Sequence, residues 1–141
     1  MLFLAGCLGS IDWAEELCPN ATVQPPVQPP IEPPAGFHLT NIRVQRDAYM
    51  AFYCARKDLF DRAVRYNPPG WTLVNETDLP ADEFLGARVL KDRLMTYRRQ
   101  NQTLSIEVVL IQTNDKNITL YDLIVGDTNE SAYHRQWNGE T

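Results

Sequence analysis

The sequence predicts an α+β fold in which an antiparallel β-meander carries one long amphipathic helix packed on a face. Two observations support this prediction. Residues 103–125 contain two runs rich in Ile, Val and Leu around a polar turn, which is the pattern of a β-hairpin. Residues 47–66 place their large apolar side chains on one arc when the residues are spaced about 100° apart, as in a helix.

The predicted helix lies between two boundary signals. Asp47 is a suitable N-cap residue, and the sequence Asn-Pro-Pro-Gly at 67–70 ends the periodic stretch. Arg56 falls within the apolar arc. Its charge either reaches solvent at the edge of that arc or meets a buried partner such as Asp92 or Glu107.

The other elements are predicted to be strands. Apolar side chains of residues 84–99 scatter around a helical wheel, so we expect a strand over 88–99 after a short helical turn near 81–86, with a helix over 84–99 as the alternative. The strands expected in chain order are 37–44, 71–75, 88–99, 103–112 and 118–125. The last two are apolar on both faces, which indicates central strands covered by the helix.

The chain of 141 residues is long enough for one domain, expected over 37–128, followed by a polar tail over 129–141. Seven of the ten prolines lie in residues 19–36. Paired prolines favour polyproline II, so we expect a semi-rigid spacer between the domain and a membrane. A ligand for an aromatic groove is the alternative for this segment.

The first residues contain the sequence Leu4-Ala5-Gly6-Cys7. It resembles the lipobox of exported lipoproteins, in which a signal peptide is cut before a cysteine that then carries a lipid. The resemblance implies lipidation of Cys7, a truncated signal-peptide remnant over 1–6, and a lipidated N-terminus with a short helical segment over 7–18. A signal peptide has a basic region and an apolar run of roughly 7–15 residues, so either the true start lies upstream or the chain has been trimmed.

Acceptor sites for N-glycosylation, Asn-x-Ser/Thr, are more frequent than this composition predicts, which is about one. The five asparagines are Asn20, Asn75, Asn101, Asn117 and Asn129. Lipobox and acceptor sites together resemble the surface lipoproteins of archaea. A Gram-positive-type bacterial lipoprotein would leave the acceptor sites unused, and a secreted eukaryotic or viral glycoprotein would make the lipobox accidental.

The chain has three cysteines. If Cys7 carries a lipid, Cys18 and Cys54 remain, and an exported protein is expected to pair them. Such a bond would convert the proline-rich segment from a free tether into a rigid loop. An intermolecular bond through Cys18, or no bond, are the other outcomes.

No motif for catalysis, a cofactor or a metal is present, so we predict none of these. His38 and His134 have no partner at metal-ligand spacing, and GxSxG, HExxH, phosphate-loop and EF-hand patterns are absent from the sequence. A net charge of −5 argues against a basic surface for nucleic acid or anionic lipid. No run of about 20 apolar residues spans a membrane.

Two clusters of charged residues could form a binding or catalytic site, although an ordinary charged surface is the stronger interpretation of each. Asp78, Asp82 and Glu83 would suit calcium or acid–base chemistry. The basic residues Lys91, Arg93, Arg98 and Arg99 would suit an anion.

We therefore expect a lipid-anchored, glycosylated, extracytoplasmic domain that is not an enzyme and that binds a partner or supports a surface complex. The alternatives are a small extracytoplasmic hydrolase using the carboxylates near 78–83, or an accessory solute-binding lipoprotein. Two lobes around a solute usually need more chain than one domain of this length supplies.

Overall fold

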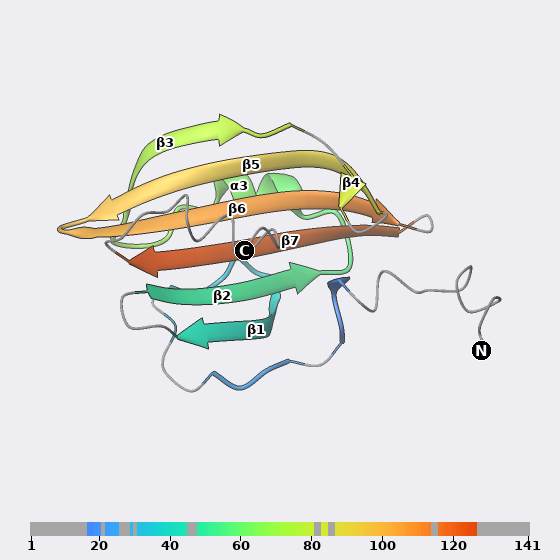
Figure 1. Ribbon diagram of the computed structural model, residues 1–141, viewed down its shortest axis with the longest axis horizontal. Coiled ribbons are helices and arrows are strands. Elements are labelled where there is room, and N and C mark those ends of the chain that lie inside the picture. The colour runs from blue at the N-terminus through green and yellow to red at the C-terminus, as the bar shows by residue number, and fades with distance from the viewer. Residues whose placement is uncertain are drawn as a thin grey trace.

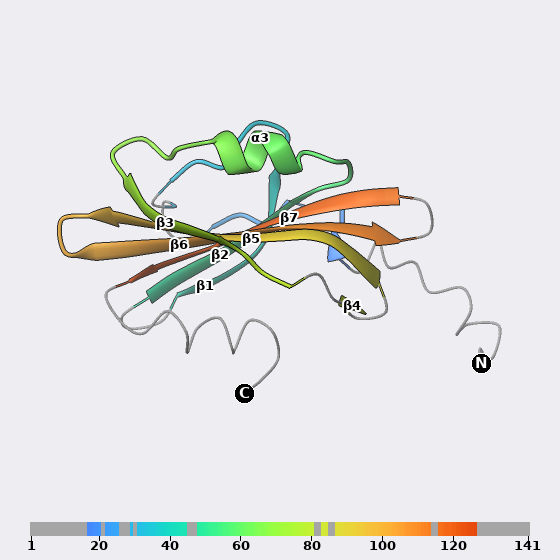
Figure 2. The same ribbon diagram turned by 90° about the horizontal axis from the view of Figure 1, so that it is seen from above.

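The computed structural model describes residues 17–20, 22–25, 29, 31–44, 48–80, 83–84, 87–113 and 116–126. These residues form one antiparallel β-sheet with a short helix over one of its faces (Figure 1, Figure 2). The strands are β1 (His38–Val44), β2 (Ala48–Ala55), β3 (Thr72–Asp78), β4 (Glu83–Phe84), β5 (Ala87–Arg99), β6 (Gln102–Thr113) and β7 (Lys116–Gly126), and the helix is α3 (Phe60–Arg65).

The strand order across the sheet is β1-β2-β7-β6-β5-β3, and the two-residue strand β4 pairs with the start of β5. Strands β5, β6 and β7 follow one another as hairpins, which confirms the predicted antiparallel meander. The β1–β2 hairpin joins the other side of β7, where Tyr53 of β2 lies opposite Tyr121. Strands β6 and β7 are therefore central, as their apolar residues predicted.

The predicted long helix is wrong, and with it the α+β fold class. Residues 48–55 form strand β2, and only Phe60–Arg65 is helical in the region assigned to the helix. The fold is mostly antiparallel β. Most of β2 is buried, with residues of both sheet faces covered, so it lacks the alternation of a half-exposed strand. Asp47 lies outside the described residues, and near the helix Asp58 accepts a hydrogen bond from the Phe60 amide at 3.2 Å.

The main core lies between the sheet and α3, on what we call the helix face. Phe60 and Ala63 of α3 pack there against alternate residues of the central strands. These include Tyr53, Met95, Tyr97, Ile106, Val108, Tyr121 and Leu123. Trp71, which follows the helix in the chain, belongs to the same cluster. Figure 2 shows α3 above this face of the twisted sheet.

The described part of the proline-rich segment lies along the domain. The Val23 amide donates to the Leu39 carbonyl of β1 at 2.9 Å, and Ile31 is buried in the main core. Near the end of the segment, the Tyr66 hydroxyl donates to the Glu32 carbonyl at 2.8 Å. The described residues of this segment are thus attached to β1 and to Tyr66, which follows α3, so the segment is a loop held on the domain, one of the two outcomes left open by the sequence.

Gly36 ends this loop in a conformation that a side chain would not tolerate. Its φ is +99°, and a Cβ at this position would lie 2.7 Å from Leu59 Cδ1. In the part of the chain that the structure describes, no helix is long and apolar enough to cross a membrane.

Candidate functional site

The predicted bond between Cys18 and Cys54 is present, and both residues are 0% exposed. It joins the start of the proline-rich loop to β2. Arg56, two residues after Cys54, donates from Nε to the Cys18 carbonyl at 2.7 Å. This hydrogen bond attaches Cys18 a second time to the chain that follows Cys54. The sequence did not indicate the Cys18 carbonyl as a partner for Arg56.

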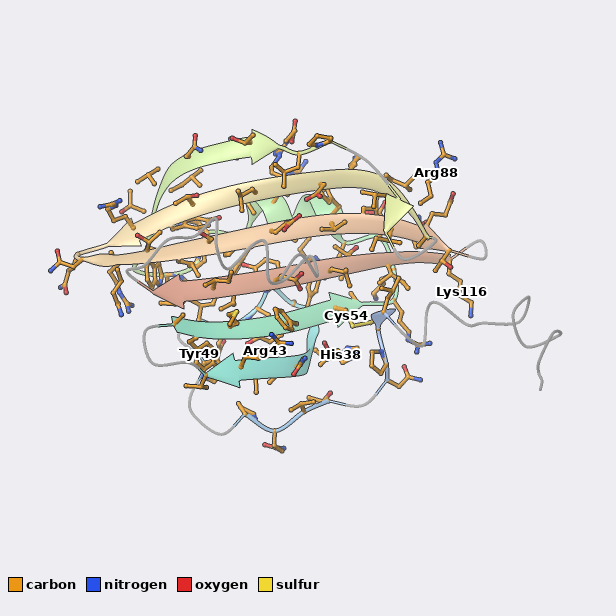
Figure 3. All side chains as sticks on the ribbon, in the orientation of Figure 1. His38, Arg43, Tyr49, Cys54, Arg88 and Lys116 are labelled. Atoms are coloured by element: carbon orange, nitrogen blue, oxygen red, sulfur yellow. A yellow bond between two sulfur atoms is a disulfide. The ribbon has the colours of Figure 1, made fainter. Side chains whose placement is uncertain are left out.

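His38 lies beside this disulfide, opposite Cys54 in the pairing of β1 with β2 (Figure 3). Its Nε2 atom is 2.6 Å from the Pro19 carbonyl oxygen and 3.7 Å from Cys54 Sγ. Cys18, His38 and Cys54 form the one group of potential metal ligands found in the described ranges. Because the two sulfurs are bonded to each other, this arrangement is a structural crosslink in its oxidised form.

The described acceptor asparagines lie around the rim of the sheet. Asn101 is in the β5–β6 turn, Asn117 is near the start of β7 at the opposite end, and Asn75 is in edge strand β3. Asn20 follows Cys18 and is exposed, as are Asn75 and Asn101, while Asn117 is half-buried. Cys7 and Asn129, the other predicted modification sites, lie outside the described residues.

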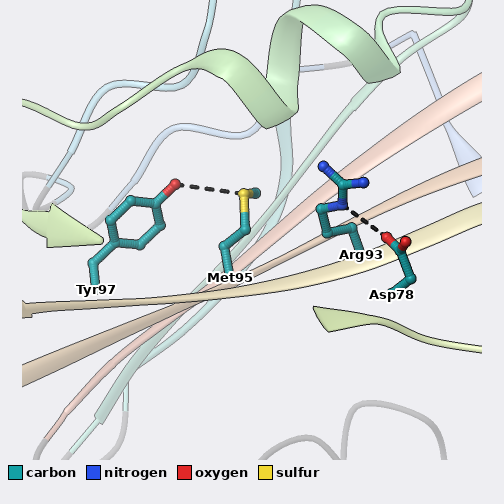
Figure 4. Close-up of polar contacts among 4 residues, drawn as sticks. All are labelled: Asp78, Arg93, Met95 and Tyr97. Carbon is teal, nitrogen blue, oxygen red and sulfur yellow. Dashed lines mark hydrogen bonds and ion pairs between the residues drawn. The ribbon is translucent and has the colours of Figure 1, made fainter. Parts of the chain in front are cut away.

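Two of the predicted charged groups meet in one ion pair. Arg93 Nε donates to Asp78 Oδ1 at 2.8 Å, and the Asp78 side chain is 74% exposed (Figure 4). This hydrogen bond is the main cause that raises the pKa of Arg93 further above its ordinary value. The side chains of Asp82 and Glu83, and the whole of His134, lie outside the described residues.

The four predicted basic residues all lie in β5 but are divided into two pairs, Lys91 and Arg93 in its first half and Arg98 and Arg99 at its end. Lys91 lies over the Phe60 ring, with Nζ 5.3 Å from the ring centre. Arg99 lies over the Trp71 ring at 4.3 Å and also donates to Gln102 at 3.0 Å. These cation–π contacts place the charges at two separate points on the helix face, which does not suit a single anion.

A hollow of about 380 Å³ lies between α3 and β5. Apolar and charged groups of both signs line it, namely Phe60, Asp61, Val64, Asp78, Leu79, Leu90, Lys91, Asp92 and Arg93. Its volume is at the lower end of the range for small-molecule sites. Within this hollow, Asp78 has Arg93 as its counter-ion.

A cluster of carboxyl groups lies on the face opposite α3, and the sequence did not predict it. Glu107 of β6 pairs directly with Asp122 of β7, and Asp92 of β5 lies next to them, opposite Val109. Glu107 is only 6% exposed. Burial, followed by a hydrogen bond with Glu107 and the charges of Glu107 and Asp122, raises the pKa of Asp92 to about 9.

One signal in the sequence would have identified these carboxyls. Glu107 and Asp122 are each a single acid within an otherwise apolar strand, and Asp92 lies in the strand before them. The cluster follows only when the register of the three strands is known, because register decides which acids become neighbours.

No protein family model matches this chain, and no curated protein matches it in sequence.

Proposed function

We propose that this chain is an extracytoplasmic domain, anchored to the cell membrane by a lipid on Cys7 and glycosylated, which binds a partner or supports a surface complex without catalysis. The observation that carries the proposal is the buried disulfide between Cys18 and Cys54. Disulfides persist in exported proteins and are rare in the reducing cytosol.

The acceptor asparagines give further support. Asn20, Asn75 and Asn101 are exposed, so a glycosyltransferase has access to each of them. Their positions at the rim leave the broad surfaces of the domain for a partner. The odd cysteine, Cys7, is accounted for by the lipid.

A non-catalytic role is favoured over the hydrolase alternative by the state of the described carboxyls. Asp78 is engaged by Arg93, and Glu107 is buried in the carboxyl cluster. The solute-binding alternative would use the hollow beside α3, which is small for a solute-binding cleft. The disulfide supports the extracytoplasmic location that the proposal and both alternatives share, whereas the carboxyls and the size of the hollow favour the non-catalytic role.

The test is the intact mass of the protein isolated from the membranes of the cells that make it. We expect an N-terminal peptide that begins at lipid-modified Cys7, together with glycan mass on the Asn75 or Asn101 peptides. A Cys7→Ser variant is the control, and it should leave the membrane fraction. Protein recovered from the cytosol with an unmodified Cys7 and reduced Cys18 and Cys54 would refute the proposal.

A further inference from the structure

Three side chains that can ligate a metal meet where β1 pairs with β2. One ligand atom each from Cys18, His38 and Cys54 lies within 4.8 Å of the other two. Both cysteines are completely buried, and His38 is half-buried. Thiolate sulfur and imidazole nitrogen are typical ligands of zinc in proteins. Because the bonded sulfurs offer no thiolate, the metal-binding capacity of this group belongs to the reduced protein.

The positions of His38 and Cys54 already match two ligands of one tetrahedral zinc ion. The two residues lie directly opposite each other in the β1–β2 pairing (Figure 3). His38 Nε2 is 3.7 Å from Cys54 Sγ. Zinc bonds of about 2.3 Å to sulfur and about 2.0–2.1 Å to nitrogen, at the tetrahedral angle, place these atoms about 3.6 Å apart. The sheet therefore holds two ligands at the required separation.

Contacts other than the disulfide keep Cys18 beside these two ligands. Its carbonyl oxygen accepts a hydrogen bond from Arg56 Nε at 2.7 Å. The carbonyl oxygen of the next residue, Pro19, is 2.6 Å from His38 Nε2, and the preceding Leu17 packs against the apolar cluster around the disulfide. Reduction removes only the S–S bond, so these contacts leave the second sulfur within reach of a metal held by the other two ligands.

The charges of such a site balance. Two thiolates neutralise Zn²⁺, so the buried complex has no net charge and avoids the cost of burying an unpaired ion. A neutral imidazole is the form of histidine that ligates a metal. Metal binding takes Nε2 of His38 from the Pro19 carbonyl, so the imidazole proton moves to Nδ1.

We propose that Cys18, His38 and Cys54 form a zinc site when the disulfide is reduced, with water in the fourth position. A dithiol reductant supplies two electrons and two protons to the S–S bond and becomes a disulfide itself. Zn²⁺ then displaces the proton of each thiol, and both protons pass to solvent. Because the same sulfurs form the bond and hold the metal, oxidation to the disulfide expels the zinc.

This site is independent of the lipid and of the glycans. The proposed function rests on the oxidised protein, so a failure to bind zinc after reduction would leave that function standing. An unmodified Cys7 in the native protein would refute the function and leave the zinc site to be judged by the reduced protein.

The first experiment is a titration of Co²⁺, a spectroscopic probe for zinc sites, into full-length protein carrying Cys7→Ser, which removes the third thiol. The protein is reduced with a dithiol and freed of it under anaerobic conditions. One equivalent of Co²⁺ should then produce the visible bands of tetrahedral cobalt and the near-ultraviolet absorption of thiolate–cobalt bonds, and Zn²⁺ should abolish both. Reduced protein without these bands, or oxidised protein with them, would overturn the proposal.

Two histidine variants form a matched pair, because the chain contains two histidines, His38 and His134. The outer partners of metal ligands are already worth roughly 10–100-fold in metal affinity, so His38→Ala should weaken Zn²⁺ binding to the reduced protein by at least about 100-fold. His134→Ala should leave the affinity unchanged. Equal affinities of His38→Ala and its parent would show that the thiols alone bind the metal.

A stability measurement keeps the test decisive where reduction unfolds the chain. A metal that binds only the folded state stabilises it, and a site assembled by folding converts binding energy into folding energy. One equivalent of Zn²⁺ should therefore raise the thermal midpoint of the reduced protein, or refold it, as followed by circular dichroism. Oxidised protein and reduced His38→Ala should not respond. Reduced parent protein that does not respond would contradict the site.

Discussion

At the scale of single residues, Asp92 makes the stability of the sheet depend on pH. Its pKa is raised from 3.8 to about 9, first by burial and then by Glu107 and Asp122. The folded state therefore holds this proton more tightly than the unfolded state does. The sign follows from linkage: the stabilisation is complete below about pH 4 and is lost progressively as the pH rises towards 9.

We predict that Asp92→Asn flattens this dependence. The amide keeps a hydrogen-bond donor for Glu107 and cannot ionise, so the free energy of unfolding at pH 8 should rise by several kcal/mol, with little change at pH 4. Urea unfolding at pH 4, 6 and 8 measures this difference. The exposed Asp61 provides the control Asp61→Asn, and equal pH slopes in the two variants would contradict the assignment.

The buried tyrosines give a second prediction at this scale, at alkaline pH. Burial raises the pKa of Tyr53 and of Tyr97 to about 12, and raises that of Tyr121 further. Unfolded tyrosines ionise near pH 10, so stability should fall between about pH 10 and 12. Absorbance at the phenolate band should therefore rise together with the loss of circular dichroism, and ionisation in the intact fold would refute this expectation.

At the scale of elements, the proline-rich loop is fixed to the domain at both ends. The disulfide closes a loop with a sequence separation of 36, and Ile31 packs in the main core between the two attachments. A crosslink of this kind stabilises the fold mainly by restricting the unfolded chain.

We predict that the double variant Cys18→Ala, Cys54→Ala loses about 3–4 kcal/mol of unfolding free energy, as expected for a loop of this length. Guanidinium unfolding of the variant and of the oxidised parent measures the loss. The reduced parent is the control and should match the variant. A change below about 1 kcal/mol would contradict this expectation and would mean that residual structure already restricts the unfolded chain without the disulfide.

The elements also show what the sequence was able to predict. The strands near 88–99, 103–112 and 118–125 were predicted because β-branched runs and polar turns mark hairpins locally. Strand β2 was mistaken for a helix because a strand buried on both faces shows no alternation. The disulfide was predicted by counting cysteines. That count does not depend on whether Cys54 lies in a helix or in a strand. The carboxyl cluster was missed because it requires the register of three strands.

At the scale of the whole molecule, the topology couples distant parts of the chain. Strand β2 pairs with β7, so Cys54 lies opposite Leu120, and the sheet cannot form without this long-range closure. Sheets dominated by such pairings fold slowly, because the entropy of closing the loop is lost before the contacts form.

We therefore predict that refolding with the disulfide intact takes milliseconds to seconds. Stopped-flow fluorescence follows it, since Trp71 becomes buried as α3 docks. A Trp71→Phe variant identifies the contribution of this residue to the signal. Refolding within microseconds would contradict the expectation from topology.

The two outer strands of the described sheet are protected from pairing in different ways. The β1 edge is covered in part by the proline-rich loop, where Val23 donates to Leu39, and strand β3 has a β-bulge between Leu73 and Asn75 and carries the acids Glu76 and Asp78. Covering loops, bulges and charges all keep a strand edge from pairing with another chain. The prolines that would serve a tether equally well therefore act here as a guard of the β1 edge, so detaching the loop would expose this edge and favour aggregation.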